Sequence, residues 1–199
     1  MPASSVTSRY APVVLLGAVL LRPAAAVAQL TDKEVGQVID AAAKMKVRSV
    51  CIAEATPGEF GVCVQGPEQR IASAALTAHQ AHRAVHPTGI SAEMRAPTWM
   101  IFALPHAPAL VAGRFVRASA DKLQLRREGS LDVPIDPIVS VHTTYAWDNP
   151  VGTKLTAQGV TATFDPSKLP PGALDVLVTT EDGSEHRYTI TESARDLIR

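Results

Sequence analysis

Three of the six histidines lie within eight residues, at His79, His82 and His86. Spacings of three and four bring side chains to the same side of a helix, and imidazole is a common ligand of zinc or copper. A metal site also needs a third or fourth ligand and hydrogen-bond partners that orient the ligands. No HExxH motif, carboxylate pair or Cys cluster accompanies these histidines. We therefore predict one half-buried and two exposed histidines and no cofactor, with a zinc or copper site as the alternative.

Tyr145 and Trp147 alternate along one predicted strand and are followed by the loop Asp148-Asn149-Pro150. Alternating residues of a strand share a face, so the two rings form either a platform for a ligand or part of a core that needs large side chains. The aspartates Asp132, Asp136 and Asp148 lie in or near turns, where such residues usually bond to the backbone. Acid-base carboxylates or a calcium site are the alternative, but no DxDxDG loop is present. No GxSxG, Walker or GxGxxG motif is present, and we predict no catalytic residue.

The N-terminal 28 residues have the pattern of a secretory signal peptide. A lone cation, Arg9, precedes the apolar run Ala11–Leu21, and Ala26 and Ala28 form an A-x-A cleavage pattern. The apolar run is too short to span a bilayer as a helix, although a retained membrane anchor is the alternative. We expect a secreted or periplasmic protein with no membrane span after cleavage.

The two cysteines, Cys51 and Cys63, flank the turn sequence Thr-Pro-Gly-Glu at positions 56–59. Folding a hairpin about Pro57 places them directly opposite each other, close enough for a disulfide. An oxidising compartment favours that bond, so we predict a bridged pair rather than free thiols or metal ligands.

The remaining pattern predicts an α+β fold in two parts. Residues 29–104 are expected to form a small α-β-β-α-β unit: a helix begins at Thr31 and Glu34, which have capping-box spacing, and a second helix runs from Pro67 to about Val85. The run Thr98–Leu104 is apolar on both faces and is typical of a buried strand. The sequence leaves open whether this strand belongs to the first part or to the second.

Residues 105–194 show several short alternating segments separated by turns, which is typical of a β-sandwich, and residues 195–199 are expected to be a tail. Within this part, GVTATFDPSKLPPGALDVLVTTEDGSEHRYTI (Gly159–Ile190) has a strand, an LPPG turn, a strand, a DG turn and a strand. It resembles the last strands of the immunoglobulin-like modules of exported bacterial proteins. The resemblance implies an antiparallel sandwich and a role as spacer, adhesive surface or binding attachment.

Charge and composition exclude some functions. Lys plus Arg and Asp plus Glu are both 19, so no strong field attracts nucleic acid. The sequence as a whole predicts a non-catalytic exported protein that binds, adheres or assembles at the bacterial cell envelope, with an unknown protein or glycan partner. A metal-binding or metal-dependent protein using the helix-borne cluster of His79, His82 and His86 is the alternative.

Overall fold

The computed structural model describes residues 29–42, 49–148 and 152–198, so the predicted signal peptide lies outside the described residues. In chain order the elements are α1 (Asp32–Ala42), β1 (Val50–Ala53), β2 (Phe60–Gln65), α2 (Pro67–Gln80), the 3-10 helix η1 (Pro87–Gly89), α3 (Ala92–Arg95), β3 (Trp99–Pro105), β4 (Ala109–Val111), β5 (Arg114–Val116), β6 (Ala120–Arg127), β7 (Val139–Asp148), β8 (Lys154–Phe164), η2 (Pro166–Lys168), β9 (Leu174–Thr180), β10 (Glu185–Ile190) and α4 (Glu192–Leu197).

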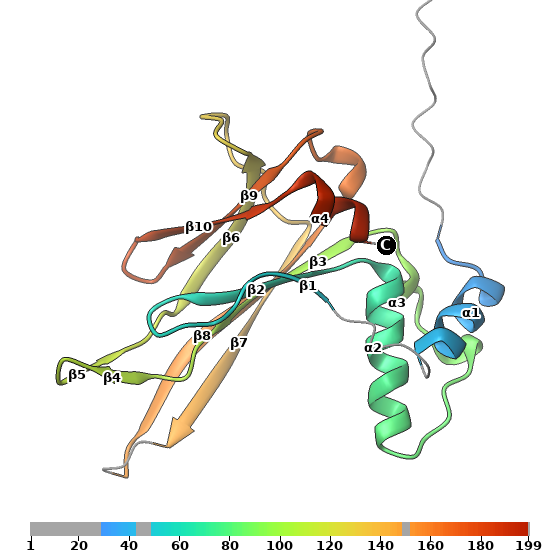
Figure 1. The fold of residues 1–199 in the computed structure, drawn as a ribbon, viewed down its shortest axis with the longest axis horizontal. Coiled ribbons are helices and arrows are strands. Elements are labelled where there is room, and N and C mark those ends of the chain that lie inside the picture. Colours follow the sequence, from blue (N-terminus) through green and yellow to red (C-terminus); the bar gives the residue numbers. More distant parts are fainter. Residues whose placement is uncertain (1–28, 43–48, 149–151, 199) are drawn as a thin grey trace, which may run out of the picture.

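The strands form two main antiparallel sheets with a small hairpin beside them. One sheet has the order β1-β2-β3-β8-β7, the second has the order β10-β9-β6, and β4 pairs with β5. Figure 1 shows the helices α1, α2 and α3 gathered at one end of the larger sheet. The mixed α+β class and the antiparallel sheets are therefore confirmed.

The core lies between the two sheets. It combines alternate residues of β2, β3 and β8 with alternate residues of β6 and β9 and the end of β10. Its fully buried large side chains include Phe60, Ile101, Phe164, Leu123 and Val176. Burying these side chains is the main favourable contribution to folding. Ile198, at the end of α4, is also part of this core, so the expected C-terminal tail is ordered through that residue.

The larger sheet joins the two halves of the sequence. β3 pairs with β2 on one side, where Ile101 opposes Val64, and with β8 on the other, where Ile101 opposes Ala162. The strand Thr98–Leu104, which the sequence left between the two predicted parts, therefore pairs with a strand of each part. Strands from both parts of the chain form one sheet. A strand with apolar residues on both faces suits this central position.

The hairpin of β1 and β2 has the predicted geometry. Cys51 opposes Cys63, and their sulfur atoms form a disulfide with the Cα atoms 3.9 Å apart. The turn closes with the amide of Glu59 donating to the carbonyl of Thr56, and Gly58 takes the positive φ of 83° that the turn requires. The predicted disulfide is confirmed.

Buried Arg70 attaches α2 to the segment that precedes β3. Its guanidinium donates to the carbonyl oxygens of Ala96 and Thr98, both at 2.7 Å, and the residue is only 6% exposed. Burial lowers the pKa of Arg70. Hydrogen bonds from charged donors are among the stronger ones, so this residue fixes the helical end of the molecule to the sheet.

The helix α2 ends earlier than predicted. Ala81 follows its last residue, and His82 has a left-handed φ of 55°. The amide of His82 donates to the carbonyl of His79, and that of Arg83 donates to the carbonyl of Ala78. This is a Schellman ending, in which His82 takes the position usually given to glycine.

Candidate binding edge

β7 is the last strand of the larger sheet, and its outer side carries no further strand in the part of the chain that the structure describes. Figure 1 shows it along the free border of the sheet. None of its ten residues is buried. The outer edge of β7 is therefore open along its length among the described residues.

The pairing of β8 shows which backbone groups of β7 face this open side. The amide of Gln158 donates to Oγ of Ser119 at 2.9 Å, and the carbonyl of Thr156 accepts from the guanidinium of Arg117. Both β8 residues therefore direct these groups away from β7, toward the segment that leads into β6.

Thr144 and Ala146 are the residues of β7 that lie opposite Gln158 and Thr156. Directly opposed residues of an antiparallel pair either exchange both backbone hydrogen bonds or neither. Thr144 and Ala146 thus direct their N–H and C=O groups to the open side, and the alternation extends this to Ser140 and His142. The edge presents a regular row of donors and acceptors.

This edge has few of the features that protect edge strands from pairing. Proteins usually guard them with charged residues, proline, bulges or short length. Residues 139–147 contain no Lys, Arg, Asp, Glu or Pro, and the pairing with β8 runs without a register shift from Val139 to Asp148. The only charge is Asp148, at the end.

One face of β7 is apolar and exposed. Val139, Val141, Thr143, Tyr145 and Trp147 share it, on the side of the sheet away from the core. Val139 is 53% and Val141 54% exposed. The rings of Tyr145 and Trp147 are half-buried and stack with centroids 6.1 Å apart. Neither ring belongs to the core between the sheets.

The opposite face of β7 is polar. Ser140, His142, Thr144 and Asp148 lie on it together with Ala146. Nε2 of His142 is 2.7 Å from the carbonyl oxygen of Asp121 on β6. This contact holds the middle of β7 from its inner side and leaves the open edge free.

The three clustered histidines do not form the arrangement that the sequence suggested. Only His79 lies on α2, because the helix ends at Gln80. His82 is in the left-handed ending, and His86 precedes η1 in an extended conformation. Among the described residues, no group of three or more His, Cys, Asp or Glu side chains is placed to hold a metal ion. The expected common helix edge is therefore wrong for His82 and His86.

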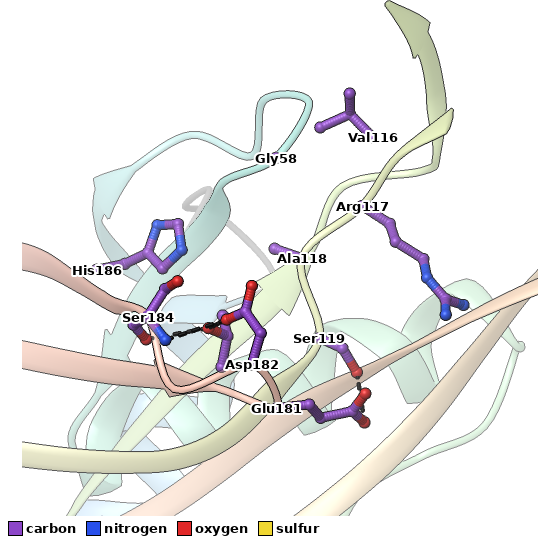
Figure 2. A pocket seen from close by; sticks show the side chains of 10 residues that line it. Gly58, Val116, Arg117, Ala118, Ser119, Glu181, Asp182, Ser184 and His186 are labelled. Carbon is purple, nitrogen blue, oxygen red and sulfur yellow. Dashed lines mark hydrogen bonds between the residues drawn. The ribbon is translucent and has the colours of Figure 1, made fainter. Parts of the chain in front are cut away.

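A polar cavity of about 370 Å³ lies at another place, between the β1–β2 turn, the segment before β6 and the β9–β10 turn. Figure 2 shows the side chains that line it. Its carboxylates already have partners: Glu181 accepts from Ser119 at 2.9 Å, and Asp182 accepts from the amide of Ser184 at 3.0 Å. These bonds shape the turn, and we assign no ligand to the cavity.

Beside this cavity, Glu59 links β2 to β10. Its Oε2 accepts from the hydroxyl of Tyr188 at 2.7 Å and lies 2.8 Å from Nδ1 of His186. The amide of Phe60 donates to the same hydroxyl at 3.1 Å. The hydrogen bond from Tyr188, and after it the contact with His186, lowers the pKa of Glu59 against the opposing effect of burial. These contacts of Glu59 and Phe60 with Tyr188 and His186 join the larger sheet to the smaller one.

Comparison with family models, curated proteins and solved structures found no match for this chain. No helix in the described ranges is long and apolar enough to cross a membrane.

Proposed function

We propose that this chain is an exported, non-catalytic assembly protein, which associates by adding an extended polypeptide strand to the open edge of β7. The observation that carries the proposal is the unguarded edge, ten residues long, with outward-facing backbone groups. An exposed row of this kind is a template for strand addition, in which main-chain hydrogen bonds give affinity and side chains on alternate positions give specificity.

The side chains of β7 favour a polypeptide over a glycan. Tyr145 and Trp147 stack on each other and are half-buried. Val139 and Val141 extend the same apolar face along the strand. A strand laid beside β7 would place its own side chains against this row and bond to the outward backbone groups, whereas a glycan has no regular row of amides and carbonyls to match them.

Export is supported by two independent features. The N-terminal sequence has the order of a secretory signal, and Cys51 and Cys63 are bonded to each other, as suits an oxidising compartment. The strand and turn order of β8 to β10, which resembles that of immunoglobulin-like modules, supports an adhesive or assembling role at the cell envelope.

Photo-cross-linking tests the proposed edge. Val141 is replaced by p-benzoylphenylalanine in cells that make the protein naturally, and Lys33, exposed on α1, is replaced in a control. We expect a discrete polypeptide adduct from position 141 that disappears when Thr144→Pro is added, because proline removes an outward amide. No adduct at position 141, or an adduct that Thr144→Pro leaves unchanged, would overturn the proposal.

A further inference from the structure

The residue order of β7 points to its occupant. Val139 and Val141 precede Thr143 by four and two residues, and Tyr145 and Trp147 follow it by two and four. All five lie on the apolar face of the strand. Small β-branched residues thus stand on one side of a central threonine, and aromatic residues stand at equal distances on the other.

From this arrangement we infer that the strand added to β7 is β7 of a second copy of this chain, antiparallel to the first and related by a two-fold axis at Thr143. This inference rests on the proposed function and specifies its partner. Val141 then faces Tyr145 of the second copy, and Val139 faces Trp147 of the second copy. Aromatic and β-branched residues form favourable cross-strand pairs.

The backbone supports the same register. Ser140, His142, Thr144 and Ala146 direct their hydrogen-bonding groups outward, so two copies can bond only where even-numbered residues oppose even-numbered residues. Pairing about Thr143 satisfies this condition, since Ser140 faces Ala146 of the second copy and His142 faces Thr144 of the second copy. A register shifted by one residue would place even-numbered residues of one copy, whose backbone groups point outward, opposite odd-numbered residues of the second copy, whose groups point to β8.

Shifts by two residues keep the hydrogen bonds but lose side-chain pairs. Moving the axis to His142 leaves Trp147 opposite Pro137, beyond the start of the strand, and sets two histidines against each other. Moving it to Thr144 puts Val139 opposite position 149, past the strand end. The axis at Thr143 pairs every residue from Val139 to Trp147.

The charge of the edge is compatible with self-association. Residues 139–147 contain no Lys, Arg, Asp or Glu, so the two-fold axis brings no like charges together. Asp148 falls opposite Ile138 of the second copy. The pairing would join two five-stranded sheets into one continuous sheet, and each copy would cover the open edge of the other.

Two cysteine variants test the inference directly. In the proposed dimer, Thr143 faces its own copy in a non-hydrogen-bonded pair, where Cα atoms are about 4.5 Å apart and a disulfide fits. The two copies of Thr144 are diagonal neighbours, roughly 7–8 Å apart, which is too far for a bridge. The native Cys51–Cys63 bond shows that directly opposed cysteines bridge in this protein.

We expect Thr143→Cys, oxidised after purification, to give roughly tenfold more covalent dimer on a non-reducing gel than Thr144→Cys. A second pair guards against poor folding of one variant: a mixture of Val141→Cys and Tyr145→Cys should cross-link, while each alone should not. Equal dimer from Thr143→Cys and Thr144→Cys, or no dimer from Thr143→Cys and the mixture, would overturn the inference.

The two proposals fail differently. If the adduct from position 141 contains another polypeptide and Thr143→Cys stays monomeric, the self-pairing is wrong and the function of the edge stands. If position 141 gives no adduct that depends on the edge, the proposed function itself is wrong.

Discussion

Tyr145 lies directly against Gly159 on the neighbouring strand: a Cβ atom on Gly159 would come within 2.8 Å of Cε2 of Tyr145. This added Cβ atom would also lie 2.9 Å from the carbonyl oxygen of Ala103. Glycine at this position of β8 leaves room for the tyrosine ring to lie against the strand, while the same ring stacks with Trp147 on β7. The apolar face of β7 therefore depends on one small residue in the strand that supports it.

Replacing that glycine tests the packing. Gly159→Ala should lower the free energy of unfolding by about 1–3 kcal/mol, because the new methyl group meets a backbone oxygen and the ring. Urea unfolding measures the change, with Gly89→Ala as the control, since nothing lies within 4 Å of a Cβ atom there. An unfolding midpoint of Gly159→Ala equal to that of the wild type would show that Tyr145 does not pack as described.

The end of α2 offers a stabilising change. His82 has a φ of 55°, a conformation that costs an L-residue about 1 kcal/mol relative to glycine. We expect His82→Gly to raise the free energy of unfolding by about 0.5–1 kcal/mol. Thermal unfolding measures it, and His79→Gly, within the helix, should have the opposite effect. A loss of stability in His82→Gly would argue against the left-handed ending.

Proline substitutions distinguish the two sides of β7. Thr143 directs its amide to β8, so Thr143→Pro should lower the free energy of unfolding by about 2 kcal/mol or more through a lost ladder bond and strain. Thr144→Pro removes an amide that faces the open side and should cost clearly less. Urea unfolding of the two variants side by side checks the order. The reverse order would mean that the outward groups belong to the odd-numbered residues.

Glu59, which links β2 to β10, makes the free energy of unfolding depend on pH. Its pKa is lowered in the folded state, mainly by Tyr188. Its contribution to stability is therefore fully present above the ordinary value of 4.5 and is lost as the pH falls through the lowered pKa. Tyr188→Phe should be less stable than the wild type at pH 7, with a smaller difference at about pH 3.

Urea unfolding at the two pH values measures this effect. Tyr145→Phe is the matched control, because Tyr145 lies on β7, away from Glu59, and this variant should keep the pH dependence of the wild type. A difference between Tyr188→Phe and the wild type that stays constant between the two pH values would show that Glu59 is not the titrating group.

Local features of the fold were predictable from sequence. Thr31 and Glu34 form the expected capping box, with the Thr31 amide donating to Glu34 at 2.8 Å, and Cys51 meets Cys63 because the turn at Pro57 sets the hairpin register. These features depend on residues close together in the chain, where turn and capping preferences act directly.

The sheet order was not predictable in the same way. The apolar faces of Thr98–Leu104 indicated a buried strand, but nothing in them specifies β8 as its neighbour, about 60 residues later. The position of β7 at the edge follows from that order. The alternating Val, Thr, Tyr and Trp residues of β7 suit a half-buried strand as well as an exposed edge strand. The sequence therefore predicted that Tyr145 and Trp147 share a face, but it did not predict that their strand lies at the edge of the sheet.

Sedimentation equilibrium of the purified chain over a wide concentration range is the most direct test of whether two copies associate through β7. For the wild type we expect a weight-average mass that rises from one chain to two, and for Thr144→Pro a mass that stays at one chain at the same concentrations. A wild-type chain that stays monomeric, or a Thr144→Pro variant that dimerises equally well, would rule out self-association through this edge.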